Sequence, residues 1–401
     1  MIRERPWRAR VSRALLGAVL ASLAASLVAA CGSQAAKATP PSLKVVTAPL
    51  STSLVTAQGA WAVVVMGGSA ASENSFWQLF VRPGGASRWS LVTPPGVADN
   101  GGLVAAGAAA RTPMLIGFRP SQGLAFSPLA MSSDTGKNWT PGLLDAALAD
   151  VPDAMAAGPS GRTLALLHDG SIEVAATAAA ATAGQWSGLT TLPALAASAP
   201  GRACGLVAVN AVSFGPDETP MAAGSCARRG VAGIFAEVGG TWQAAGPALP
   251  AALGGDQVQV LGLASTVPAN QGAGTVALLL AGTDLLAAWS NGARWTVSAP
   301  VAAGPVRASG FGPAGSVWLL LGDGRAETIA GAGGSWQALP PVPAGTQALV
   351  PPATGGPAAG TGYDALAASG SRLTVWQLAR AGTAWTKDQV ISVPIEYGSS
   401  S

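Results

Sequence analysis

Residues 132–139 read Ser-Ser-Asp-Thr-Gly-Lys-Asn-Trp, a glycine-containing turn that ends on a tryptophan. A glycine-rich turn with a tryptophan in or just after it recurs along the chain, and the interval between successive copies averages about 49 residues. The seven tryptophans in this context are Trp89, Trp139, Trp186, Trp242, Trp295, Trp336 and Trp385. Such a period is typical of repeat architectures, in which each repeat is one supersecondary unit.

The segments between these tryptophans have the pattern of β-strands. Short apolar runs such as Leu278-Leu279-Leu280 alternate with tight turns such as Asp169-Gly170 and Asp323-Gly324, as strands and hairpins do. Four strands with their turns need about 40–50 residues, the length of one propeller blade. We therefore predict an all-β fold, a seven-bladed β-propeller over residues 45–401.

Six or eight blades are alternatives, and a pair of β-sandwiches would also suit an all-β chain, although it does not explain the period. A closed ring buries both faces of each blade and leaves only short edges. We expect residues 43–46 or 389–393 to close the ring by adding a strand to a blade built from the other terminus.

Residues 132–139 resemble the Asp-box, Ser-x-Asp-x-Gly-x-Thr/Asn-Trp, of sialidase-like propellers with bacterial neuraminidase repeats (BNR repeats). They match at Ser132, Asp134, Gly136 and Trp139. The resemblance implies a structural turn: the aspartate accepts backbone N–H bonds, glycine supplies a positive φ, and the indole packs against neighbouring strands. In that family the box joins the third and fourth strands of a blade, away from the ligand face. The resemblance supports the architecture and does not carry activity.

The N-terminus has the layout of a secretory signal peptide. Residues 2–13 are basic, and residues 14–30 are apolar with small residues at the end. Val28-Ala29-Ala30-Cys31 resembles the bacterial lipobox, which implies a diacylglycerol on the Cys31 thiol and cleavage before that residue. An ordinary signal peptide and a retained transmembrane helix are the alternatives, and seventeen apolar residues are few for a span that needs about 20.

These features predict three parts: a lipoprotein signal peptide (1–30), a lipidated cysteine with a flexible tether (31–44) and the propeller (45–401). The expected location is the extracytoplasmic face of the cell membrane, through the lipid anchor. The sequence pI of 9.0 reflects the leader: removing its five arginines and one glutamate changes the formal charge from +3 to about −1. A nucleic-acid partner is therefore not expected, because it needs a basic stripe that survives processing.

Cys204 and Cys226 are the two remaining cysteines, 22 residues apart. In an exported protein such a pair predicts a disulfide bond, with two free buried thiols as the alternative. Two cysteines and one distant histidine do not make a four-ligand zinc site, so we expect neither a metal nor another cofactor.

A sialidase-like glycoside hydrolase is the competing hypothesis. That family clamps a carboxylate with three arginines, a geometry suited to the guanidinium fork, and uses a tyrosine–glutamate pair as nucleophile and an aspartate as acid/base. This chain offers Tyr363, Tyr397 and, in a faint match to the arginine motif, Arg119. His168-Asp169 is interpreted as part of a hairpin turn, because adjacent strand residues point to opposite faces.

The pattern as a whole favours a non-catalytic binding or scaffold module, a membrane-anchored β-propeller with no assigned catalytic residue. Its ligand, a protein, a peptide or a wall glycan, is expected at the central funnel or at the loops of one face. An assembly factor for other exported proteins is a further alternative. Arg228-Arg229 and Asp217-Glu218 are interpreted as solvated loop charges.

Overall fold

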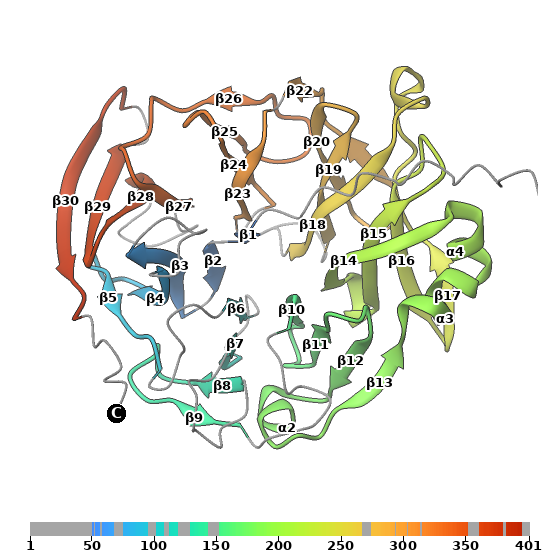
Figure 1. Ribbon diagram of the computed structural model, residues 1–401, viewed down its shortest axis with the longest axis horizontal. Coiled ribbons are helices and arrows are strands. Elements are labelled where there is room, and N and C mark those ends of the chain that lie inside the picture. Colours follow the sequence, from blue (N-terminus) through green and yellow to red (C-terminus); the bar gives the residue numbers. More distant parts are fainter. Residues whose placement is uncertain are drawn as a thin grey trace, which may run out of the picture. The chain divides into compact units, whose positions relative to one another are not determined.

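The computed structural model describes residues 50–51, 53–56, 58–67, 75–94, 102–107, 112–118, 129–142, 152–266, 274–292, 294–302, 304–312, 315–351, 361–379 and 382–394. All of them belong to one compact unit, Val45–Ser401. Its strands form antiparallel units of four that follow one another around a ring (Figure 1). The prediction of a seven-bladed β-propeller is confirmed.

Each blade is built from consecutive strands, innermost first. Blades 1 to 3 are β2 (Ser53–Thr56), β3 (Gly59–Gly67), β4 (Ser75–Pro83) and β5 (Ser90–Leu91); β6 (Leu103–Ala106), β7 (Met114–Phe118), β8 (Leu129–Ser132) and β9 (Thr140–Pro141); β10 (Ala154–Ala157), β11 (Thr163–Leu166), β12 (Ile172–Ala175) and β13 (Ser187–Thr190). Blades 4 and 5 are β14 (Leu206–Phe214), β15 (Pro220–Cys226), β16 (Gly233–Val238) and β17 (Thr241–Ala244); β18 (Val258–Thr266), β19 (Gly274–Ala281), β20 (Asp284–Ser290) and β21 (Trp295–Val297). Blades 6 and 7 are β23 (Val306–Phe311), β24 (Val317–Leu321), β25 (Ala326–Ile329) and β26 (Gln337–Ala338); β27 (Thr346–Val350), β28 (Thr361–Ser369), β29 (Arg372–Ala379) and β30 (Trp385–Ser392).

A few elements lie outside this scheme. Strand β1 (Leu50–Ser51) runs parallel to β23, and β22 (Val301–Ala302) pairs with β20. Short helices lie in the segments that connect the strands of blades 3 to 5. They are α2 (Ala178–Thr182), α3 (Leu192–Ala197), α4 (Ala199–Cys204), and the 3-10 turns η2 (Pro216–Glu218) and η3 (Ala251–Leu253). Threonine or serine caps the N-terminus of each α-helix, as at Ser198, whose Oγ accepts the Gly201 N–H.

The common strand order gives the ring two distinct faces. We call the face where the innermost strands begin the proximal face; it carries the turns between second and third strands and the links from one blade to the next. The opposite, distal face carries the turns between third and fourth strands, and the seven repeat tryptophans lie in these turns or at the start of the fourth strand. Bonds between neighbouring blades join like ends, as between Gly67 and Gly370 at the proximal ends of β3 and β28.

The core lies between the blades. The second strands are apolar without alternation and are buried on both faces, as in β3 and β24, because each blade is covered by two neighbours. One cluster joins Val64 and Phe80 of blade 1 to Val350 and Leu366 of blade 7. Further clusters connect other pairs of neighbouring blades in the same way.

The repeat tryptophans connect successive blades through their indole N–H groups. Nε1 donates to the carbonyl oxygen of a residue just after the outermost strand of the preceding blade. The pairs are Trp139 with Val92 (2.8 Å), Trp295 with Ala245 (2.8 Å), Trp336 with Ala299 (3.1 Å) and Trp385 with Pro340 (3.2 Å). Trp186 donates to Ala181 of the inserted helix α2 instead, and Trp242 packs against the cluster around the two cysteines. The period in the sequence therefore reflects a recurring contact between blades.

Ring closure differs from the expectation for residues 389–393. Residues 389–392 belong to β30, the outermost strand of blade 7 itself, and residues 43–46 lie outside the described residues. All four strands of blade 7 come from one continuous segment, whereas the short strand β1 adds to blade 6 beside β23. Side chains close the ring instead: Trp89 Nε1 donates to Asp364 Oδ2 (3.0 Å), and the Gln389 amide bonds both the backbone N–H and the carbonyl of Trp89 (2.9 and 2.8 Å).

Candidate functional site

The Asp-box turn lies between β8 and β9, the third and fourth strands of blade 2, on the distal face. Asp134 Oδ1 accepts the Asn138 N–H at 2.9 Å, and Ser132 Oγ accepts the Gly136 N–H at 2.9 Å. The hydrogen bonds from Asn138, that of its backbone N–H foremost, lower the pKa of Asp134. Gly136 has φ +78°, and a Cβ there would lie 2.7 Å from Val92 Cβ. The Asp134 carboxylate thus accepts hydrogen bonds from residues of its own turn.

A central cavity of about 290 Å³ is the main candidate for a binding site. The innermost strands β2, β6, β10, β14, β18 and β23 line it. Alanine, valine, leucine and other apolar residues dominate its wall, and of the described lining residues only Asp153 carries a charge. A wall of this composition favours an apolar ligand over a charged one.

The polar groups at this cavity bond to one another. The Asn210 amide donates to Ser225 Oγ and to the Val260 carbonyl, both at 3.2 Å. Ser213 Oγ lies 3.2 Å from Ser265 Oγ. Such pairs fix the spacing between β14 and β18 and satisfy groups that would otherwise be costly to bury. Sequence reasoning did not find Asn210, because no motif marks a residue whose partners lie on two other strands.

The tyrosine that a sialidase-like site requires does not reach this cavity. The Tyr363 hydroxyl bonds Thr328 Oγ1 between blades 6 and 7, and burial raises the pKa of Tyr363. A phenol held there in its neutral form is a poor nucleophile. The other two residues of the hypothesis, Arg119 and Tyr397, lie outside the described residues.

His168 and Asp169 form the turn that the sequence predicts. Asp169 Oδ1 accepts the Ser171 N–H at 2.8 Å, and Gly170 has φ +79°. The hydrogen bond to Ser171 lowers the pKa of Asp169. The exposed imidazole faces another residue: His168 Nδ1 lies 3.6 Å from Asp153 Oδ2. This places His168 near the proximal mouth of the cavity and separates it from Asp169.

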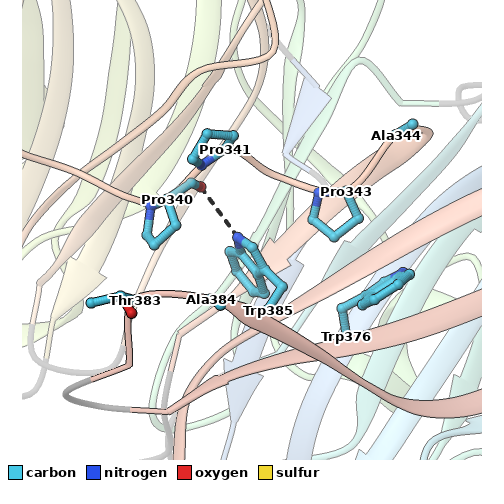
Figure 2. Close-up of a pocket in the computed structure, with 8 residues that line it drawn as sticks. All are labelled: Pro340, Pro341, Pro343, Ala344, Trp376, Thr383, Ala384 and Trp385. Atoms are coloured by element: carbon cyan, nitrogen blue, oxygen red, sulfur yellow. Dashed lines mark hydrogen bonds between the residues drawn. The ribbon is translucent and has the colours of Figure 1, made fainter.

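An uncharged surface groove of about 430 Å³ lies between blades 6 and 7 (Figure 2). Its lining residues are Pro340, Pro341, Pro343, Ala344, Trp376, Thr383, Ala384 and Trp385. Figure 2 shows the Trp385 indole directed at the Pro340 carbonyl, the bond that connects these two blades. Trp61, Trp289 and Trp318 are buried in the blades, whereas Trp376 is partly exposed at this groove and Trp77 is partly exposed at the central cavity.

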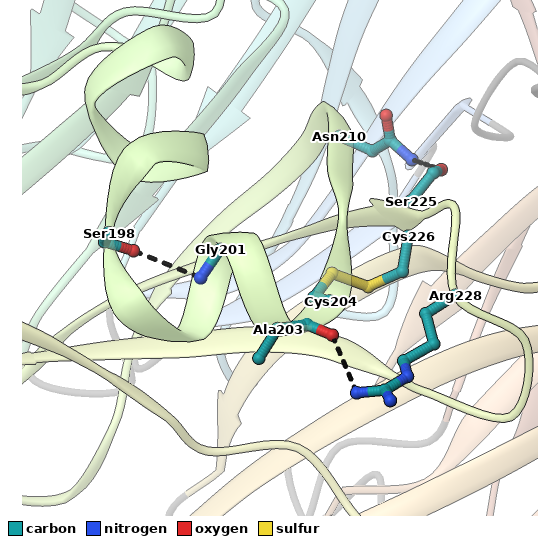
Figure 3. The surroundings of a disulfide bond; sticks show 8 residues. All are labelled: Ser198, Gly201, Ala203, Cys204, Asn210, Ser225, Cys226 and Arg228. Atoms are coloured by element: carbon teal, nitrogen blue, oxygen red, sulfur yellow. Dashed lines mark hydrogen bonds between the residues drawn. A yellow bond between two sulfur atoms is a disulfide. The ribbon is translucent and has the colours of Figure 1, made fainter.

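Cys204 and Cys226 form a disulfide bond between the end of α4 and the end of β15 (Figure 3). Both cysteines are buried in the cluster of blade 4. Their backbones are neighbours because Leu206 of β14 pairs with Cys226. The bond thus fastens the helical link to the proximal end of the blade.

Two charged residues that sequence reasoning missed are buried between blades 1 and 7. Arg82 Nη1 lies 3.1 Å from Asp364 Oδ2, and the two side chains are 6% and 1% exposed. Burial raises the pKa of Asp364, against the attraction of Arg82 and the Trp89 bond. These groups serve ring closure and do not face the cavity wall.

Among the residues that the structure describes, no three histidine, cysteine, aspartate or glutamate side chains gather as metal ligands. Within the same residues no helix has the length and hydrophobicity to cross a bilayer.

No protein-family model and no curated protein sequence matches this chain. Solved structures do resemble it. YCF48 bound to D1 peptide has 14% identity and a TM-score of 0.44, over 84% of this chain and 92% of that one. The periplasmic gluconolactonase of Pseudomonas aeruginosa has 14% identity and a TM-score of 0.47, over 82% and 95%. The six-bladed fungal lectin from Aleuria aurantia has 13% identity and a TM-score of 0.36, over 88% and 100%. The fold of this chain is assigned from its own strand order.

Proposed function

We propose that this protein is a membrane-anchored extracytoplasmic lipoprotein whose propeller binds an apolar ligand, such as a segment of a partner protein, in its central cavity. The observation that carries the binding role is the wall of that cavity. Its polar side chains Asn210, Ser213 and Ser265 are already paired, so the wall offers mainly apolar surface. An apolar segment gains about 25 cal/mol for each Å² removed from water.

The export and anchoring part of the proposal rests on residues 2–31, with their basic start, apolar run and lipobox-like end. The buried disulfide is in keeping with an oxidising compartment. Labelling cells with a fatty-acid probe tests the anchor. Label that is present in the parent and absent after Cys31→Ala supports acylation, and equal labelling of both contradicts it.

The cavity is tested by filling it. Ala105 of β6 and Ala264 of β18 line it from two blades. We expect a double Ala105→Phe/Ala264→Phe variant to lose binding of apolar peptides selected from a display library on the parent protein. Ala86→Phe/Ala332→Phe, at exposed positions in distal turns, is the matched control and should bind as the parent does. Equal binding by the filled variant would exclude the cavity as the site.

The glycoside hydrolase remains the second hypothesis, and Tyr363 is its weakest point, because the phenol is buried and bonded to Thr328. Turnover of a fluorogenic glycoside panel that disappears in Tyr363→Phe would support hydrolysis and contradict a purely binding role. The outcome that we expect is no turnover by either form.

A further inference from the structure

Blade 4 carries an unusual concentration of arginine on the proximal face. Arg202 lies on α4, and Arg228 and Arg229 lie in the turn after β15. All three are exposed. Arg228 Nη1 donates to the carbonyl of Ala203, next to Arg202, at 3.2 Å (Figure 3). We call Arg202, Arg228 and Arg229, with helices α3 and α4, the arginine surface.

The three guanidinium groups of the arginine surface bond backbone carbonyls. Arg202 and Arg229 bond the backbone carbonyls of Ala197 and Gly255. Among the described residues, no ion pair joins any of the three arginines to a carboxylate. Asp256, whose backbone carbonyl accepts the Gly230 N–H, has its carboxyl group against Gly282. Three positive charges thus remain available to a partner.

The uncharged residues around them are small and apolar. Pro193, Ala194 and Ala197 of α3 are exposed, and Val207 at the start of β14 is 39% exposed. Arginines beside small apolar residues can lie flat against a charged surface, with the guanidinium groups in the headgroup region. The distal face of the same blade has the opposite charge, with Asp217, Glu218 and Glu237.

The side from which the chain enters the propeller favours a membrane over an acidic protein as the partner of the arginine surface. Strand β1 leads directly into β2, which begins at the proximal face, and β1 pairs in parallel with β23. The described chain therefore enters the propeller from the proximal side, the side of the arginine surface. A lipid at Cys31 would hold this side nearest the membrane.

We propose that the arginine surface binds the anionic headgroups of the membrane on which the protein is anchored. This inference rests on the proposed lipid anchor, which brings the protein to the membrane. The arginine surface adds a second contact that orients the propeller with its distal face away from the bilayer. A basic residue close to an anionic membrane contributes about fivefold to the binding constant. Three arginines therefore contribute about 100-fold together.

The test uses the mature chain from residue 31, made without acylation as Cys31→Ser, so that binding does not depend on lipidation. Sedimentation measures its binding to vesicles of phosphatidylcholine mixed with the anionic lipid phosphatidylglycerol, and to vesicles of phosphatidylcholine alone. We expect binding to the anionic vesicles only, weakened by salt. Arg202→Gln/Arg228→Gln/Arg229→Gln should reduce it about 100-fold.

The matched control removes the same charge from the distal face. Arg88→Gln/Lys137→Gln/Arg294→Gln changes three exposed basic residues in distal turns and should bind as the parent does. Equal losses in both triple variants, or no binding by the parent, would overturn the proposal. So would binding of the parent to an oligo-aspartate peptide and not to vesicles, which would assign the surface to an acidic protein. Unfolding curves of the triple variants confirm that each is folded.

Discussion

The buried ion pair between blades 1 and 7 gives the sharpest prediction about stability. Arg82 and Asp364 lie 3.1 Å apart and are almost fully buried, and the Arg82 guanidinium lies 5.6 Å from the centre of the Trp89 ring. Arg82→Met keeps most of the apolar stem and removes the charge. Asp364 then either stays ionised in an apolar setting or takes up a proton.

Either result costs a similar amount of free energy. Breaking a buried pair by removing one partner costs about 3–5 kcal/mol. Protonating a carboxyl group of ordinary pKa, near 3.9, at pH 7 costs about 4 kcal/mol. We therefore expect Arg82→Met to lower the free energy of unfolding by about 4 kcal/mol. The double variant Arg82→Met/Asp364→Asn, which keeps an acceptor for Trp89 Nε1, should recover more than half of that loss.

The assay is guanidinium denaturation followed by tryptophan fluorescence, with the denaturant dependence compared between variants. The deficit should also depend on pH. Burial already raises the pKa of Asp364, and the loss of Arg82 raises it further. A carboxyl group with a raised folded pKa favours folding most below its unfolded pKa and loses that contribution as pH rises through the folded value. The deficit of Arg82→Met should thus shrink toward pH 4.

The reasoning is refuted if Arg82→Met and the double variant are equally unstable at pH 7. It is also refuted if the single variant loses less than about 1 kcal/mol, the range of an exposed pair. In either case the two charges would not be coupled, and packing of the shared core of blades 1 and 7 would account for ring closure.

Three further predictions concern the distal turns and the disulfide. Asp134→Asn should destabilise the protein at neutral pH, because hydrogen bonds lower the pKa of Asp134 in the folded state. The stabilisation from a lowered pKa is present above the unfolded pKa and is lost as pH falls through the folded pKa. The melting temperatures of parent and variant should therefore converge in acid. Trp139→Phe removes the donor to the Val92 carbonyl and should cost about 1 kcal/mol in denaturant titrations, with no loss contradicting the inter-blade role. Reducing the Cys204–Cys226 bond should cost about 3 kcal/mol, and the Cys204→Ser/Cys226→Ser protein should show that loss without responding to reductant.

The sequence alone determined the repeat unit, and physical chemistry explains why. A tryptophan after a glycine turn is needed in most blades to bond the neighbouring blade, so its period of about 49 residues is visible in the chain. Strand type followed from apolar runs and turns, and the pairing of Cys204 with Cys226 followed from their number and from the predicted export signal. These features are local, or they recur.

The tertiary structure decided what depends on partners far apart in the chain. The closure of the ring by Trp89, Arg82 and Asp364 joins residues 275 positions apart, and no local pattern distinguishes Asp364 from a surface aspartate. The apolar cavity arises only when six inner strands meet around one axis. The arginine surface likewise forms because the β14–β15 pairing brings Arg202 beside Arg228 and Arg229, since contacts between strands follow the geometry of the sheet and leave no mark on the spacing of residues in the sequence.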